Sequence, residues 1–187
     1  MQYINAFIEI KQLSEELWDK KIPEEIYGYQ IQPGTKWKNG LSGNEINAFE
    51  KSMGFDFPEM LRDYYSVMNG VDKESVNVFR ESGCAYTYSK MLYGYPEDIR
   101  LLEDLTQLIY DENYIEKDSM KEKNISRIFP VYAHYFMLID HPMHPILSMY
   151  GQEIFCYENN LVDMFYHKLA RRDEFRQFHG MGYGWIG

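Results

Sequence analysis

The stretch Glu45–Gly70, EINAFEKSMGFDFPEMLRDYYSVMNG, is the most strongly patterned part of the chain and decides its fold. Ser42, followed by Glu45 three residues later, has the form of a capping box, in which each side chain satisfies a free amide at a helix start. Gly54 is typical of a left-handed helix stop. The apolar residues between these two signals recur at helical spacing and predict one buried face: Ile46, Phe49 and Met53.

A second helix is expected directly after a tight turn. Pro58 is a favoured first residue of a helix, and Asn69–Gly70 is expected to end it. The residues expected to point mostly inward are Met60, Leu61, Tyr64, Tyr65, Val67 and Met68. The stretch has no catalytic or metal-binding spacing, so it predicts a helix pair that packs on the rest of the protein.

Outward from this pair, the pattern predicts alternating helical and β segments. Residues 2 to about 20 read as an amphipathic helix, and residues 27–41 as an irregular or short-stranded connection. Residues 76–95 are β-rich, and Pro96 and Asp98 open a helix that runs to about Tyr110. Residues 111–127 are charged and indicate a loop or partial helix.

The last third of the chain predicts an antiparallel meander and a final helix. Three short β candidates are separated by turn residues: IFPVYAHYFMLID, PILSMYG and EIFCYE. The helix is expected from Asn159 to about Phe178, before the tail GMGYGWIG. We therefore expect one α+β domain, with a mixed, largely antiparallel sheet flanked by helices.

Composition limits the function classes. The chain has 187 residues and a formal net charge of −10, which disfavours binding to phosphate backbones and anionic lipid. No apolar run approaches the ~20 residues that span a bilayer, and the N-terminal sequence lacks signal-peptide features. Cys84 and Cys156 lie outside any CxxC spacing, and their aromatic neighbours predict burial in strands. Unpaired thiols in a reducing cytoplasm are expected, with a single disulfide as the alternative.

The helix pair resembles the signature of the SUKH superfamily. The corresponding residues are Ile46, Phe49, Glu50, Gly54, Pro58, Tyr64, Tyr65, Asn69 and Gly70. Further along, Pro130 in FPVYAH is similar to an early strand proline of the family, and PILSMYGQEIFCYENNLVDMF to its hairpin and last helix. The resemblance covers roughly residues 42–167 and is loose over 76–127. Much of this signature consists of helix-cap and packing residues, so its role is expected to be mainly structural.

The superfamily includes a fungal regulator of cell-wall assembly and many bacterial immunity proteins that bind polymorphic toxins, often nucleases. The resemblance therefore implies a single SUKH-like domain over residues 1–187. Residues 1–41 would be an N-terminal helix and connection, and residues 168–187 the end of the last helix and a Gly/aromatic tail. It also implies a non-enzymatic module that needs no cofactor and neutralises a cognate toxin. Together with the thiols and the negative charge, this predicts a cytoplasmic protein with no direct contact to nucleic acid or membrane.

The acidic segment 97–118 is the expected partner surface. Clustered carboxylates steer a basic partner, and interleaved tyrosines supply anchors. The candidate residues are Glu97, Asp98, Glu103, Asp104, Tyr110, Asp111, Glu112 and Tyr114. The alternative is a solvated helix face followed by a charged loop.

Two other functions remain open. One is a regulatory or scaffold module in a cell-envelope or signalling pathway, as in the fungal branch. The other is a hydrolase or metal-dependent enzyme that uses His134, Asp140, His141 and His144. The prolines in HPMHP exclude a regular helix there and the cluster matches no known zinc motif, so a loop with solvated or hydrogen-bonded histidines is preferred. The sequence contains no nucleophile elbow, P-loop or dinucleotide fingerprint.

Overall fold

The first predicted helix is present, with both of its end signals. A computed structural model describes residues 2–20, 29–77 and 87–170. In α2 (Gly43–Met53), the Ser42 side chain accepts a hydrogen bond from the Glu45 amide, and the Glu45 carboxylate accepts one from the Ser42 amide at 2.8 Å. Gly54 follows in the left-handed conformation, at φ 78°. The local sequence alone therefore sets both ends of α2.

The second helix, α3 (Glu59–Val67), is shorter than expected. Pro58 caps it rather than forming its first residue. Met68–Val71 form strand β3, which pairs antiparallel with β2 (Trp37–Asn39), so the expectation that Asn69–Gly70 end the helix is wrong. Gly70 does adopt a positive φ of 70°, but a Cβ there would lie 2.9 Å from the Gly94 nitrogen. Glycine at position 70 therefore allows the β3 backbone to lie close to the distant backbone around Gly94.

The other helices follow the predicted order. The expected N-terminal helix is α1 (Ile4–Trp18), and the helix expected after Pro96 is α4 (Ile99–Glu112), with Asp98 as its N-cap residue. A single 3-10 turn, η1 (Lys117–Ser119), lies in the charged 111–127 segment. The final helix is α-helical over α5 (Leu161–Phe165) and continues as a π-helical turn, η2 (Tyr166–Ala170). The remainder of that prediction, residues 171–178, lies outside the described residues, as do the tail and Cys84.

The helices and small antiparallel sheets confirm the expected α+β fold. All strand pairs among the described residues are antiparallel, so the sheets are not mixed there. Besides the β2–β3 pair, one small sheet has the order β1-β4-β5 and the largest has the order β6-β7-β8-β9. The strands of the small sheet are β1 (Tyr29–Gln30), β4 (Ser75–Asn77) and β5 (Thr87–Ser89). Those of the meander are β6 (Ile128–Tyr132), β7 (Tyr135–Leu138), β8 (Ile146–Tyr150) and β9 (Glu153–Glu158).

The meander itself confirms the prediction, with one correction. The segment 128–140, expected as one β element, is the hairpin β6–β7, which turns at Ala133 and His134. Ala133 takes a positive φ of 49° although it is not glycine. A turn without Gly, Pro or Asn gives no local signal, so the sequence pattern could not reveal it.

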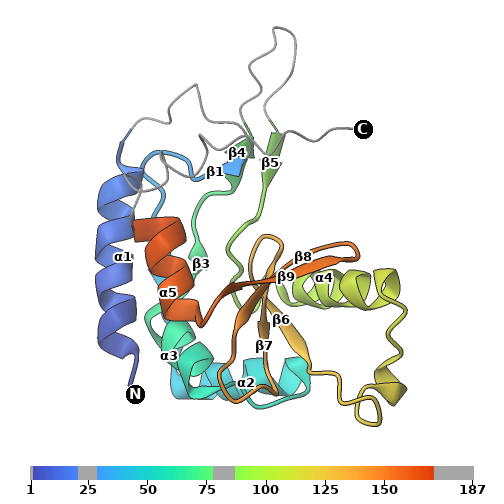
Figure 1. Ribbon diagram of the computed structural model, residues 1–187. Coiled ribbons are helices and arrows are strands. Elements are labelled where there is room, and N and C mark those ends of the chain that lie inside the picture. The colour runs from blue at the N-terminus through green and yellow to red at the C-terminus, as the bar shows by residue number, and fades with distance from the viewer. Residues whose placement is uncertain (1, 21–28, 78–86, 171–187) are drawn as a thin grey trace, which may run out of the picture.

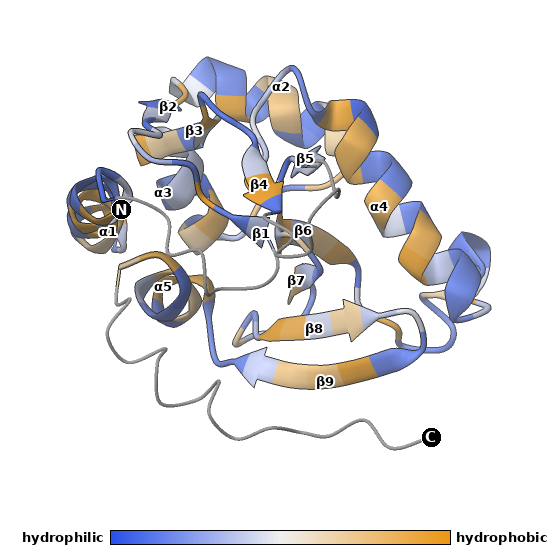
Figure 2. Cartoon of the chain, turned by 90° about the horizontal axis from the view of Figure 1, so that it is seen from above, coloured by the Kyte–Doolittle hydropathy of each residue, from blue (hydrophilic) through white to orange (hydrophobic). Residues whose placement is uncertain are grey.

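The elements surround a core that is rich in aromatic rings. α1, α3 and α5 lie on one side of the molecule, and α4 lies on the other beside the meander (Figure 1). Hydrophobic and hydrophilic residues alternate along α2 and α4, as expected of helices with one buried face (Figure 2). Phe49 is completely buried. Its ring centroid lies within 4.8–6.1 Å of those of four other rings: Phe57, Tyr65, Tyr95 and Phe129.

The residues that carry the SUKH resemblance occupy positions that hold these elements together. Ile46, Tyr64 and Pro130 are buried. Pro130 lies in β6, which has a single neighbour among the described strands, and such an edge position tolerates proline. The buried Glu50 accepts a hydrogen bond from the Phe57 amide at 2.7 Å and forms an ion pair with Arg62 across the α2–α3 turn.

Candidate functional site

The acidic segment is split by the fold into exposed and buried residues. Glu103, Asp104, Asp111 and Glu112 are exposed on α4, and the side chain of Tyr114 after it is 83% exposed. Glu97 is also exposed and lies 3.8 Å from the ammonium of Lys38.

Two of the expected partner-binding residues are structural, which corrects the sequence interpretation. Asp98 is buried, where it accepts a hydrogen bond from the Gly94 amide at 2.9 Å and pairs with Lys90. Tyr110 is buried against β6, and its hydroxyl accepts a hydrogen bond from the Ile128 amide at 3.2 Å. Burial raises the pKa of Tyr110 above its ordinary value. Neither side chain is accessible to a partner that docks on this surface.

The structure adds the β8–β9 hairpin, which the sequence did not connect with this segment. The side-chain Nδ2 of Asn113 donates a hydrogen bond to the Gly151 carbonyl at 3.0 Å, and the side-chain Nε2 of Gln152 donates one to the Glu112 carbonyl at 3.2 Å. The hairpin turn thus lies beside the C-terminal end of α4 (Figures 1 and 2). Contacts between residues 38 or 40 positions apart leave no local pattern.

We call the resulting surface the acidic corner. It consists of Asp111, Glu112, Tyr114, Tyr150 and Glu153, all of them exposed. The side chain of Tyr150 is 71% exposed, and Tyr150 pairs with Glu153 across the hairpin. Two large, accessible tyrosines therefore lie beside three carboxylates.

The charges of the acidic corner are poorly compensated. Among the described residues, none of its three carboxylates has a cation within ion-pair distance. Asp111 accepts a hydrogen bond from Gln107 at 2.7 Å. Asp111 and Glu112 are also the last residues of α4, which has no basic residue in its final turn. The helix dipole disfavours anions at this end, typically by about 0.3–1 kcal/mol each.

The outer strand β9 adds exposed apolar surface next to the corner. Ile154, Phe155 and Cys156 are all exposed, so the expectation that Cys156 is buried is wrong. β9 is the last strand of the meander and has only one neighbour, β8, among the described strands. The continuous apolar run in β9 is typical of a strand buried on both faces, which explains the wrong prediction that Cys156 is buried.

The histidines of the metal hypothesis are separated by the fold. His134 lies in the β6–β7 turn, with its ring 5.4 Å from that of Tyr150, whereas His141 and His144 lie in the loop after β7. His144 Nδ1 lies 3.2 Å from the Leu138 carbonyl oxygen, and Asp140 pairs with Arg127. Within the described ranges, no group of three or more His, Cys, Asp or Glu residues is arranged to hold a metal ion.

Lys168 is a partly buried cation that lies between two aromatic rings. The ammonium of Lys168 lies 4.6 Å from the ring centroids of both Tyr135 and Tyr157. Burial lowers the pKa of Lys168 to about 8, whereas the nearby Glu158 acts in the opposite direction. The pKa of His134 is lowered by burial and by the charge of Lys168. Cation–π contacts of this kind stabilise a lysine that is removed from water.

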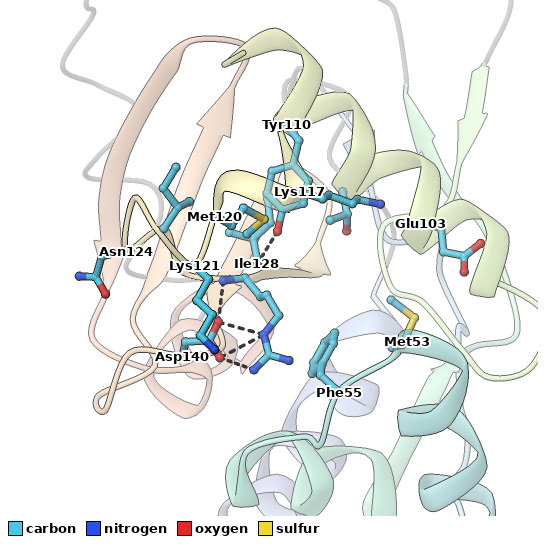
Figure 3. Close-up of a pocket in the computed structure, with 13 residues that line it drawn as sticks. Met53, Phe55, Glu103, Tyr110, Lys117, Met120, Lys121, Asn124, Ile128 and Asp140 are labelled. Atoms are coloured by element: carbon cyan, nitrogen blue, oxygen red, sulfur yellow. Dashed lines mark hydrogen bonds and ion pairs between the residues drawn. The ribbon is translucent and has the colours of Figure 1, made fainter. Parts of the chain in front are cut away.

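A groove of about 660 Å³ lies beside α4. Its residues come from α4, the end of α2 and the 117–127 segment, with the Arg127–Asp140 ion pair in its wall (Figure 3). Glu103, an expected partner-binding residue, lines this groove.

No protein-family model matches this chain. Searches of curated proteins and of solved structures also gave no significant match. None of the described helices is both long and apolar enough to cross a bilayer.

Proposed function

We propose that this protein is a SUKH-like immunity protein, which binds a cognate toxin domain in the cytoplasm and blocks it without a cofactor and without catalysis. The observation that carries the proposal is the acidic corner. Asp111, Glu112 and Glu153 lack cationic partners among the described residues, and they share this corner with the exposed side chains of Tyr114 and Tyr150.

This arrangement suits a basic protein surface. Uncompensated carboxylates accelerate the encounter with a cationic partner, and tyrosines provide large contact areas with few rotatable bonds. A nuclease toxin needs a cationic groove for the phosphate backbone, so an acidic inhibitor can compete for the same surface. We infer that the corner covers such a groove and blocks it by steric and electrostatic means.

The position of two carboxylates at the wrong end of a helix supports a role in binding. Asp111 and Glu112 face the negative end of the α4 dipole, where lysine or arginine would stabilise the helix better. The presence of two carboxylates at this end of the helix therefore needs another explanation, and attraction of a basic partner supplies one.

A co-expression experiment tests the proposal. The partner to use is the C-terminal domain of the polypeptide encoded immediately upstream. We expect this protein to restore growth of cells that produce that domain and to co-purify with it in a complex that weakens as salt is raised. Failure to bind or to protect against this domain would contradict the proposed function.

A scaffold or regulatory module is the second candidate, and strand β9 favours it. Ile154 and Phe155 are exposed on a strand whose outer edge has no neighbour among the described strands, and an extended peptide of a non-toxic partner can add to such an edge. A stable complex with a protein that is not toxic would favour this function.

A further inference from the structure

The groove beside α4 has an apolar interior that does not depend on the acidic corner. Met53 and Phe55 line it from the end of α2, and Met120 and Ile128 from the opposite side. Its volume of about 660 Å³ falls within the roughly 300–1,000 Å³ typical of small-molecule sites. Methionine side chains adapt to ligands of different shape, so this interior suits a compact apolar group.

Two walls of the groove are held in place by polar contacts. The carboxylate of Asp140 accepts hydrogen bonds from the Arg127 amide at 2.8 Å and from its guanidinium. That guanidinium lies 5.1 Å from the centre of the Phe55 ring. The Tyr110 hydroxyl accepts its hydrogen bond from the first residue of β6. These contacts shape the groove before any ligand binds, which limits the entropy lost on binding.

Two cations remain available for a ligand. Lys117 and Lys121 line the groove from the 117–127 segment, as Figure 3 shows, and both are exposed. Over the part of the chain that the structure describes, neither has a carboxylate within ion-pair distance. The charge of Arg127, by contrast, is balanced by Asp140.

We propose that this groove binds a small amphipathic monoanion. An apolar body of one or two rings packs against Phe55 and Met120, and a single carboxylate or sulfonate lies near Lys117 and Lys121. This assignment is independent of the proposed toxin binding, because it uses different residues.

The charges in the groove favour a monoanion over a polyanion. Three cations, Lys117, Lys121 and Arg127, face two carboxylates, Glu103 and Asp140, which gives a formal charge of +1. A triphosphate would place several negative charges near Glu103 and Asp140. Repulsion from these carboxylates would therefore cancel much of the affinity that the two lysines provide for a triphosphate.

Fluorescence titration with 8-anilino-1-naphthalenesulfonate tests the proposal, with ATP as the polyanionic probe. We expect saturable binding of one naphthalenesulfonate per chain and no binding of ATP. The double variant Lys117→Gln/Lys121→Gln should weaken binding of the sulfonate by about tenfold, because the anion loses its two cationic partners. The neutral analogue N-phenyl-1-naphthylamine should bind both proteins equally.

Matched variants separate the groove from general surface effects. Lys51→Gln/Lys123→Gln makes the same charge change at exposed lysines outside the groove and should leave sulfonate binding unchanged. Thr106→Phe places a ring inside the groove and should abolish binding of both naphthalene probes. The proposal is overturned if the wild-type protein shows no saturable binding of the sulfonate, or if ATP binds more tightly than the sulfonate. It is also overturned if the two double variants weaken sulfonate binding equally, or if Thr106→Phe leaves it unchanged.

Discussion

The side chain of Asn69 binds both backbone polar groups of Tyr95. Its Oδ1 accepts a hydrogen bond from the Tyr95 amide at 2.7 Å, and its Nδ2 donates one to the Tyr95 carbonyl at 2.7 Å. The Gly70 backbone lies close to Gly94 in the same region. The Asn-Gly end of the patterned stretch therefore joins β3 to the chain that leads into α4.

Loss of this connection should destabilise the fold. Asn69→Ala leaves the Tyr95 amide and carbonyl without these partners, and we expect the free energy of unfolding to fall by about 2–3 kcal/mol. Asn69→Asp keeps the acceptor for the Tyr95 amide but buries a carboxylate oxygen against the Tyr95 carbonyl, so it should destabilise the protein as well. Urea denaturation measures both changes, and an unchanged midpoint for Asn69→Ala would show that water replaces the amide at no cost.

Tyr64→Phe should have the opposite effect. The Tyr64 hydroxyl is buried and has no hydrogen-bond partner among the described residues, so its removal should raise the free energy of unfolding by about 1 kcal/mol. Tyr93→Phe is the matched control, because the Tyr93 hydroxyl donates to the Ala133 carbonyl at 3.2 Å and its loss should destabilise the protein. If both variants are destabilised, the Tyr64 hydroxyl has a partner after all.

The carboxylates at the end of α4 should cost stability. Asp111→Asn and Glu112→Gln should each raise the free energy of unfolding by about 0.3–1 kcal/mol, because each removes a negative charge from the negative end of the helix dipole. Asp104→Asn provides the comparison: Asp104 lies 3.9 Å from Arg100 one turn earlier and should give no gain. Lower stability in the first two variants would assign these carboxylates a structural role.

Lys168 should make stability depend on pH. Its pKa is about 8 in the folded protein and higher in the unfolded chain, so the unfolded chain binds more protons above pH 8 and the free energy of unfolding rises with pH. Between pH 8 and 9.5, wild type should gain on the order of 1 kcal/mol relative to Lys168→Met. Denaturation at both pH values checks this; the range stays below the titration of unfolded tyrosines near pH ~10. If the free energy of unfolding changed equally with pH in both proteins, Lys168 would be fully solvated and its pKa unshifted.

The sequence predicted those elements whose signals are local. The capping box at Ser42, the glycine stop at Gly54 and the spacing of apolar residues were sufficient to predict α2, because they depend on residues within a few positions of each other. The turn at Ala133 and the strand that contains Asn69 depend on contacts across the fold, and the sequence interpretation missed both.

The candidate site was predictable only in part, for the same reason. The acidic residues of α4 were visible as a charge pattern. Periodicity did not distinguish Tyr110, which points inward, from its exposed neighbour Asp111. Tyr150 and Glu153 belong to the site because two hydrogen bonds join the β8–β9 turn to the end of α4. Such long-range contacts leave no local sequence pattern.

The most direct test of the proposed function is the affinity for the C-terminal domain of the upstream-encoded polypeptide. Wild type should be compared with Asp111→Lys/Glu112→Lys and with Glu16→Lys, which reverses an exposed charge on α1, on the opposite side of the molecule (Figures 1 and 2). We expect the double variant to raise Kd by at least about a hundredfold at low salt, with a weaker salt dependence, and Glu16→Lys to leave Kd within about twofold. An equal Kd for all three proteins would contradict binding through the acidic corner.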